Sequence, residues 1–406
     1  MKLNDTSLGN VAESIQTGPF GSQLHSSDYS EDGTPVIMPQ DIVDWSISED
    51  KIARVSEDHV NRLKRHKCKI GDIIYPRRGD LAKCAFITNR EEGWLCGTGC
   101  LKVSIDETKA LPKYVYFHLQ QPYSINCIEV ATVGSTMANL NISILSKIKL
   151  RLPSLDIQKK VIDILSRYDD LIAVNRKRIA ILEEMAMRTY REWFVHFRFP
   201  GNESCEFENG LPKGWKKDEA QHFFDISIGK TPPRKESQWF TADECGLPWL
   251  SISDMKGGCF VFSSSENLTE DAISKHNIVI VNEDTVLLSF KLTVGRISIA
   301  AVPMCTNEAI AHFKSTDSYK REYCYCYLKG FTFETLGSTS SIATAINSKT
   351  VKKMPFILPS NDILEAFSNA TRSIFDEIKV IQRSIIKLKQ MRDRLLPQLM
   401  NGQLEI

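Results

Sequence analysis

The sequence contains no long hydrophobic segment. Across its 406 residues the apolar stretches are short and interrupted, and none has the roughly 20 apolar residues that a transmembrane helix needs. The first ten residues, MKLNDTSLGN, lack the apolar region of a secretory signal peptide. We therefore expect a cytoplasmic protein and not a membrane or secreted one.

An excess of charge of one sign and closely paired cysteines are also missing. The chain has 51 Lys and Arg against 50 Asp and Glu, a net charge of +1, so any basic surface for nucleic acid must be local. Its 11 cysteines are scattered, and neither Cys96 with Cys100 nor Cys324 with Cys326 has the CxxC spacing of a zinc site. We expect buried, reduced thiols and no metal site.

Familiar catalytic motifs are absent as well. The stretch Gly229-Lys230-Thr231 lacks the upstream glycine of a GxxxxGK[ST] phosphate loop. There is no GxGxxG after a strand, no HExxH, no GxSxG and no Asn-Pro-Pro-aromatic motif of the kind found in adenine methyltransferases. Together these absences favour a binding protein and predict no catalytic residue in this chain.

What the sequence does contain is an internal repeat. Residues 150–194 align without a gap with residues 356–400, and the Leu-Pro-Ser tripeptides at Pro153 and Pro359 are 206 residues apart. A weaker match upstream pairs Asn141 with Asn347, and GTPVIMPQDI (33–42) resembles GLPWLSISDM (246–255) at an offset of 213. The chain is therefore a duplication of a variable domain of about 150 residues followed by a long helix.

The variable parts are predicted to be mixed, β-rich domains. Runs of β-branched and aromatic residues bounded by Gly, Pro and Asp indicate strands, and two longer apolar stretches indicate short helices. The expected strands are 72–75, 84–88, 286–290 and 297–300, and the expected short helices are 111–119 and 323–328.

Two long helices follow the variable parts, with Ser154 and Ser360 as candidate N-caps. Forty residues make a rod of about 60 Å, too long to pack only on its own domain, which is the alternative, so we expect the two helices to pair. Apolar residues at heptad spacing mark the seam, and Asn175, the counterpart of Ile381, is a polar residue in it that can fix register. The predicted seam is Ile172, Asn175, Ile179, Leu182, Ile378, Ile381, Ile385 and Leu388.

Three pairs of loops are candidates for DNA contact. They occupy equivalent places in the two halves, differ in sequence, and carry side chains that donate to phosphates or read base edges. The alternative is that they are ordinary solvated loops. The candidates in the first half are Thr17, Phe20, Ser22, Gln23, Arg77, Arg78, Lys83, Ser135 and Thr136, and those in the second half are Lys230, Thr231, Arg234, Lys235, Gln238, Trp239, Lys291, Arg296 and Ser340.

The whole chain resembles the specificity (S) subunits of type I restriction–modification systems. The resemblance is carried by the duplicated layout and by five short sequence motifs: LPSLDIQ (152–158), TYREWFVHFRFPG (189–201), LPKGW (211–215), IGKTPPRKESQWF (228–240) and LLPQLMNGQL (395–404). One departure is that the start of the second long helix has no glutamine matching Gln158, although Glu365 is near.

The resemblance implies an α+β fold with two target-recognition domains and two long helices that form an antiparallel coiled coil in a pseudo-twofold arrangement. The expected parts are a first recognition domain (1–153), a first helix (154–200), a linker (201–210), a second recognition domain (211–358), and a second helix with a tail (359–406).

It also implies a function in bacterial or archaeal defence against foreign DNA. Each recognition domain would read one half of an asymmetric bipartite site on double-stranded DNA. The partners would be two methylation (M) subunits, which use S-adenosylmethionine to methylate adenine N6, and two restriction (R) subunits, which use ATP and Mg. The chain itself would hold no cofactor and catalyse nothing. Two rival hypotheses are a lone methyltransferase or nuclease with unrecognised motifs, and a coiled-coil scaffold that never touches bases.

Overall fold

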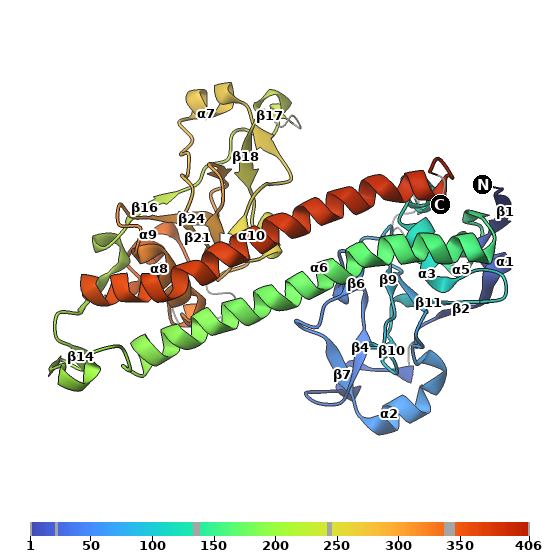
Figure 1. Ribbon diagram of the computed structural model, residues 1–406, viewed down its shortest axis with the longest axis horizontal. Helices are drawn as coiled ribbons and strands as arrows, with labels where there is room; N and C mark the ends of the chain where they lie inside the picture. The colour runs from blue at the N-terminus through green and yellow to red at the C-terminus, as the bar shows by residue number, and fades with distance from the viewer. Residues whose placement is uncertain (1, 21–22, 133–138, 242–245, 337–345, 405–406) are drawn as a thin grey trace. The chain divides into compact units, whose positions relative to one another are not determined.

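The computed structural model describes residues 2–20, 23–132, 139–241, 246–336 and 346–404 (Figure 1). The chain forms two compact units. Unit 1 comprises Met1–Asp170 and Lys389–Ile406, and unit 2 comprises Leu171–Leu388. Each unit therefore combines a β-rich domain with a part of both long helices. Among the described residues, no helix combines the length and the apolar character needed to span a membrane.

Unit 1 is built on two four-stranded sheets. The sheet with the longer strands, called the larger sheet below, has the order β2-β11-β8-β9 and is antiparallel. The second sheet has the order β10-β4-β7-β3 and contains a parallel pair. Two smaller sheets join β1 to β12 and β5 to β6. The strands are β1 (Asn4–Ser7), β2 (Ala12–Thr17), β3 (Tyr29–Ser30), β4 (Thr34–Ile37), β5 (Ile42–Val43), β6 (Ser46–Ile47), β7 (Ala53–Val55), β8 (Ile73–Pro76), β9 (Ala85–Phe86), β10 (Leu95–Cys96), β11 (Cys100–Ile105) and β12 (Lys149–Leu152).

Unit 2 repeats this plan. Its larger sheet has the order β16-β24-β21-β22-β19, and its second sheet has the order β17-β20-β18-β23. Pairs β15 with β25 and β13 with β14 complete the set. The strands are β13 (Phe207–Glu208), β14 (Leu211–Pro212), β15 (Lys216–Glu219), β16 (Asp225–Ile228), β17 (Phe240–Thr241), β18 (Leu247–Leu250), β19 (Phe260–Val261), β20 (Asn267–Leu268), β21 (Val286–Ser289), β22 (Ile297–Ala300), β23 (Cys305–Thr306), β24 (Ile310–Lys314) and β25 (Pro355–Leu358).

Short helices complete both units. The expected helix at 111–119 is α3 and the one at 323–328 lies within α8, so both are confirmed, and each of the four expected strands overlaps a strand of the structure. The short helices are α1 (Leu8–Val11), α2 (Glu57–Arg62), α3 (Pro112–Leu119), α4 (Pro122–Thr132), α5 (Ile142–Ser146), α7 (Glu270–His276), α8 (Lys320–Lys329) and α9 (Ser348–Lys352).

The duplication is visible in the pairing of strands. In unit 1, β4 lies parallel to β10, with Val36 opposite Leu95. In unit 2, β18 lies parallel to β23, with Trp249 opposite Cys305. Parallel pairs need a long crossover connection, so the same pair in both units reflects one topology used twice. The repeat with an offset of 206 holds too, because β12 and α5 are matched by β25 and α9.

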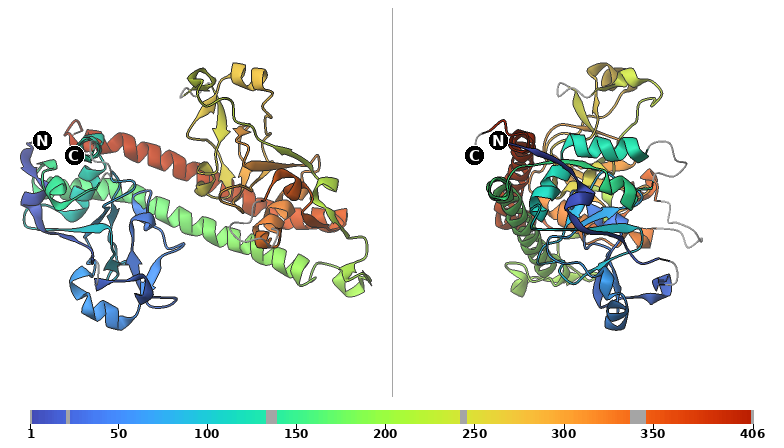
Figure 2. Two further views of the ribbon diagram at one scale, coloured as in Figure 1. Left: turned by 180° about the vertical axis from the view of Figure 1, so that it is seen from behind. Right: turned by 90° about the vertical axis from the view of Figure 1, so that its right-hand side faces the viewer.

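The two long helices are α6 (Leu155–Tyr190) and α10 (Asn361–Met400), and they pair in an antiparallel coiled coil (Figures 1 and 2). Both begin directly after the serines that the sequence indicates as caps. In unit 2, Arg178 is ion-paired with Glu377, whereas Phe194, just beyond α6, packs edge-on against Phe367. Position numbers therefore rise along one helix as they fall along the other.

Each unit buries its own part of the helix pair. In unit 2 the core includes five of the predicted seam residues, Ile172, Leu182, Ile378, Ile381 and Ile385, with Ile179 and Leu388 packed against it. Asn175 is half-buried. In unit 1, Leu396 and Leu399 of α10 share a core with Val161 and Leu165 of α6, and Arg392 Nη1 lies 2.8 Å from Asp169 Oδ1.

The aromatic segment after α6 belongs to the core of unit 2. The helix continues into a π-helical turn at Arg191–Val195, and the ring of Phe194 contacts Trp215 and Tyr323 as well as Phe367. An aromatic cluster of this size contributes several kcal/mol of apolar burial, roughly 1.5–3 kcal/mol for each ring. The segment therefore anchors the end of α6 to the second recognition domain.

Candidate nucleic-acid interface

In unit 1, two of the predicted loops leave the same edge of the larger sheet. Strand β11 starts at Cys100 between the ends of β2 and β8, with Leu101 opposite Thr17 and Cys100 opposite Pro76. The Gly18 N–H donates to the Cys100 carbonyl at 3.0 Å, and the Arg77 N–H donates to the Gly99 carbonyl at 2.7 Å. These bonds hold the start of both loops side by side.

Phe20, Gln23 and Arg77 meet at this edge. The guanidinium of Arg77 lies 5.1 Å from the centre of the Phe20 ring, and its Nε donates to the Leu140 carbonyl at 3.3 Å. The Gln23 side chain accepts the Phe20 N–H at 3.1 Å. The ring remains 47% exposed, so a cation and an open aromatic face are presented together, as in surfaces on which bases stack.

The other candidates of unit 1 are more scattered. Arg78 is exposed, and Lys83 Nζ is 3.0 Å from Asp80 Oδ2, so its charge is partly balanced. Thr17 is half-buried at the end of β2. Ser22, Ser135 and Thr136 lie outside the described residues.

Unit 2 builds the same edge from different residues. Strand β24 starts at Ile310 between the ends of β16 and β21. The Gly229 N–H donates to the Ile310 carbonyl at 3.1 Å, and the Phe290 N–H donates to the Ala309 carbonyl at 2.9 Å. The loops carrying Lys230 and Lys291 therefore start side by side, as those of Gly18 and Arg77 do in unit 1.

A glycine is required at the start of the first loop in both units. A Cβ at Gly18 would lie 1.9 Å from the carbonyl oxygen of Gly97, and one at Gly229 would lie 2.0 Å from the Thr306 hydroxyl and 2.2 Å from the Asn307 carbonyl oxygen. No side chain fits at such distances, because the obstacles include backbone atoms. Close backbone approach therefore explains why both loops begin with glycine.

Two cations of the first loop of unit 2 already have partners inside unit 2. Lys230 Nζ donates to the His276 carbonyl at 2.6 Å. The guanidinium of Arg234 donates to both carboxylate oxygens of Glu266 at 2.8 Å and lies 4.4 Å from the centre of the Trp249 ring. A phosphate or base contact from Arg234 must therefore compete with a carboxylate.

Glu308 lies among these cations. The sequence pattern did not indicate this acidic residue as part of the site. Its carboxylate accepts a hydrogen bond from the Thr231 hydroxyl. Burial raises the pKa of Glu308, but this bond, its own backbone N–H and the charges of Lys291 and Arg234 outweigh burial and hold the pKa below its ordinary value. The loop pair is therefore a mixed-charge network with Glu308 as an ionised acceptor.

Two of the candidates for DNA contact are bound to partners within unit 2 and are at least half-buried. The Trp239 ring is buried, with its Nε1 donating to Glu236 at 2.9 Å, and it packs edge-on against His276. Arg296 is half-buried and donates to the Ile252 carbonyl at 2.6 Å. Lys235, Gln238 and Lys291 are exposed, and Ser340 lies outside the described residues.

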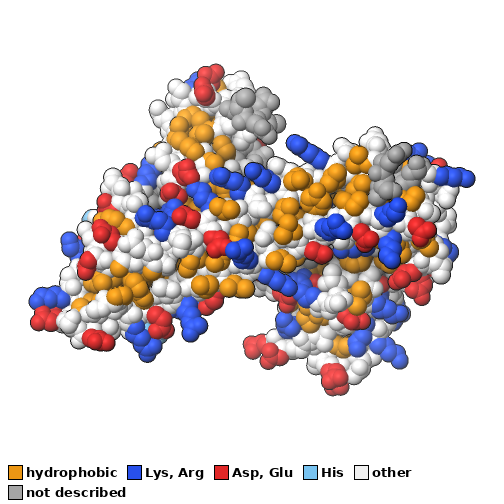
Figure 3. All heavy atoms as spheres, viewed as in Figure 1, with side chains coloured by type: hydrophobic (Ala, Val, Ile, Leu, Met, Phe, Trp, Pro, Cys, Tyr) orange, Lys and Arg blue, Asp and Glu red, His pale blue; other side chains and the backbone are white. Residues whose placement is uncertain are grey.

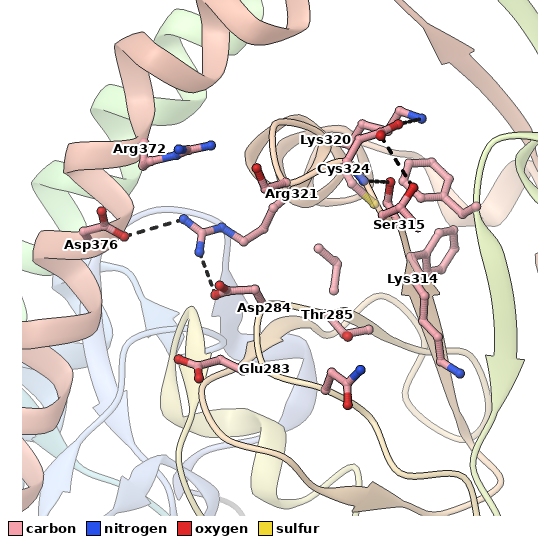
Figure 4. Close-up of a pocket in the computed structure, with 17 residues that line it drawn as sticks. Glu283, Asp284, Thr285, Lys314, Ser315, Lys320, Arg321, Cys324, Arg372 and Asp376 are labelled. Carbon is pink, nitrogen blue, oxygen red and sulfur yellow. Dashed lines mark hydrogen bonds and ion pairs between the residues drawn. The ribbon is translucent and has the colours of Figure 1, made fainter.

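A cavity of about 490 Å³ lies on unit 2 beside the start of α8 (Figure 4). Arg321 points into it, with its guanidinium 2.6 Å from both Asp284 and Glu322 and 3.6 Å from Asp376. Burial lowers the pKa of Arg321, but Glu322 and Asp284 reverse this and raise it. The charges lining the cavity largely neutralise one another, which is typical of a structural ion-pair network.

The described residues provide nothing that resembles a metal centre. Their cysteines are all free thiols, and burial raises the pKa of Cys84 to about 12. No group of three His, Cys, Asp or Glu side chains within the described part of the chain could hold a metal ion.

A sequence model described as "Type I restriction modification DNA specificity domain" matches residues 4–184 and again residues 212–388. The chain belongs to this family, and the two matches fall on its two halves.

Individual relatives agree with the family model. The specificity subunit of the type I restriction enzyme MjaIX from Methanocaldococcus jannaschii is 24% identical over 388 residues, which cover 92% of this chain and 87% of the relative. The specificity subunit of the HindI enzyme from Haemophilus influenzae is 22% identical over 404 residues, covering 83% and 87%. The crystal structure of an S subunit from M. genitalium has the same fold, with a TM-score of 0.54, 13% identity, and coverage of 98% of this chain and 96% of that one.

Proposed function

We propose that this chain is the DNA-specificity subunit of a type I restriction–modification complex and that each unit reads one half of an asymmetric bipartite site. The observation that carries the proposal is the sheet edge built twice with unlike side chains. In unit 1 the edge presents Phe20 and Arg77, whereas in unit 2 it presents Lys291 beside the Glu308 network. The same scaffold with different reading groups suits recognition of two different sequences.

The proposal assigns catalysis to partner subunits. The M subunits would hold S-adenosylmethionine and methylate adenine, and the R subunits would use ATP and Mg, with two copies of each. The family's specificity subunits define where those partners act. The lone-enzyme hypothesis would require a catalytic site in this chain, and the scaffold hypothesis would leave the two unlike edges without a purpose.

The exposed face of α6 in unit 2 supports a docked partner. Leu171, Val174, Ile181 and Met185 recur at heptad spacing and are 47%, 60%, 62% and 50% exposed. We call these four residues the outer stripe. Figure 3 shows hydrophobic side chains (orange) reaching the surface along the long helices. A row of exposed apolar side chains on a helix is typical of a protein interface, and an M subunit is the partner that we propose for it.

Methylation mapping tests the function. The chain is produced with its M partner in cells, and the methylated motif is read by sequencing. We expect a bipartite motif with two unlike halves. Replacing residues 1–150 with those of a relative should change one half alone, and the unmodified chain is the control. Change in both halves or in neither would contradict the assignment of one half-site to each unit. Methyl transfer by the purified chain without partners would favour the enzyme hypothesis.

A further inference from the structure

Leu292 is the most exposed large apolar residue described in this chain. Its side chain is 100% exposed, and its backbone has a φ of +59°, in the left-handed region. Residues other than glycine rarely adopt this backbone conformation, because their Cβ crowds the neighbouring carbonyl oxygen. Leu292 therefore combines a disfavoured backbone with an apolar side chain that buries nothing within the chain.

The equivalent turn of unit 1 has a glycine at the position of Leu292. Pro76 lies opposite Cys100, and Ser289 lies opposite Ile310. Counting three residues on from each strand end gives Gly79, with a φ of +86°, and Leu292. Glycine is the ordinary residue for this conformation, so the second unit carries a leucine where the fold itself favours a glycine.

The turn around Leu292 is tightly held. The Thr293 N–H donates to the Lys291 carbonyl at 2.6 Å, which closes a three-residue turn with Leu292 at its centre. The Ser289 hydroxyl donates to the Thr293 carbonyl at 2.6 Å and accepts the Arg296 N–H at 3.0 Å. The surrounding bonds impose the left-handed conformation, a pattern that occurs where a strained residue has a functional role.

We propose that Leu292 is a specificity-determining residue whose side chain packs against the C5-methyl group of a thymine in the half-site read by unit 2. The inference rests on the proposed function. In the major groove thymine presents this methyl beside the O4 acceptor. The loop tip offers a matching pair, an isobutyl group on Leu292 and the ammonium of its exposed neighbour Lys291. This loop tip lies at the sheet edge of unit 2, where the charges of Lys291 and Arg234 both lower the pKa of Glu308.

The test uses duplexes in which each thymine of that half-site is replaced in turn by deoxyuridine, which lacks only the methyl group. The chain is assembled with its M partner, and the half-site is first defined by methylation mapping. At one position we expect the unmodified complex to bind about fourfold more weakly, the loss for one methyl group. Leu292→Gly should bind both duplexes equally, and Leu292→Met should retain the difference.

Leu292→Gly also separates a reading role from a structural one. Because glycine suits the left-handed turn, the variant should keep or raise the thermal midpoint of unfolding. The inference is overturned if Leu292→Gly remains as sensitive to deoxyuridine as the unmodified chain, if the half-site contains no thymine, or if the variant assembles less with M, which would place Leu292 in a protein interface. If the unmodified complex methylates no specific sequence, the proposed function fails first, and this inference fails with it.

Discussion

Asn141 and Asn347 cap two different helices in the same way, 206 residues apart. The Oδ1 atom of Asn141 accepts the Ile144 N–H at 3.0 Å at the start of α5, and that of Asn347 accepts the Thr350 N–H at 2.9 Å at the start of α9. Each bond satisfies an N–H that the helix leaves without a partner. Two asparagines shared by weakly similar segments are thus explained by one local interaction used twice.

Removing either cap should destabilise the protein. We expect Asn141→Ala and Asn347→Ala each to lower the free energy of unfolding by about 1 kcal/mol, measured by urea titration followed by circular dichroism. Asn→Asp at the same positions is the matched control, because a carboxylate also accepts the N–H and suits a helix N-terminus. Equal loss in the Ala and Asp variants would contradict the capping role.

Acid should destabilise unit 2 through His312. This residue is fully buried on β24, with its ring nitrogens 2.9 Å from the Ser227 hydroxyl and 2.7 Å from that of Thr306. Burial, aided by Lys314, lowers the pKa of His312 to about 3. An unfolded histidine titrates near pH 6.5. The contribution is therefore complete above about pH 6.5 and is lost as pH falls toward 3, by roughly 1.4 kcal/mol per pH unit.

A glutamine substitution isolates that contribution. His312→Gln retains groups that can bond the two hydroxyls but takes up no proton, so the free energy of unfolding should depend less steeply on pH between 6 and 4 than in the unmodified chain. Urea titrations at pH 7.5, 6, 5 and 4 measure the slope. The exposed His196→Gln is the control and should leave the slope unchanged. A slope unaltered by His312→Gln would exclude His312 as the source.

Arg234 should contribute to DNA affinity in competition with Glu266. We expect Arg234→Ala to weaken binding of the chain with its M partner by about 1 kcal/mol or more, measured by fluorescence anisotropy. Glu266→Gln removes the competing charge and should leave affinity unchanged or increase it. If both substitutions weaken binding and lower the unfolding midpoint together, the pair is a structural link and Arg234 does not reach DNA.

The outer stripe should decide assembly with M. Val174→Lys and Ile181→Lys place a charge on an exposed helix face, so the fold should be retained while binding to M weakens at least tenfold. Size-exclusion chromatography and circular dichroism report the two effects. Val130→Lys, at a valine of α4 that is 65% exposed, is the matched control. Normal assembly of both stripe variants would locate the M interface elsewhere.

The sequence predicts those parts of the fold that depend on local patterns. The duplication, the long helices beginning after Ser154 and Ser360, and the strand at 297–300 follow from spacing and composition, and the structure confirms them. The surroundings of Trp239 and Arg296 do not follow, because they depend on partners far away in sequence. Trp239 is buried with Leu268 of β20 and Cys305 of β23, and Arg296 reaches the Ile252 carbonyl. Polar loop composition indicates neither contact.

Gly18 and Gly229 have no room for a Cβ, so at each of the two sheet edges the start of the first loop is sterically fixed while its tip is not. A side chain at Gly18 or Gly229 would push its Cβ into backbone carbonyl oxygens, whereas the segments that follow run outward from a strand end that is already held by hydrogen bonds. A designer who wants new target sequences would therefore leave these anchor positions untouched and randomise the loop tips. Libraries built in this way would vary the recognised DNA sequence while the fold of each unit is retained.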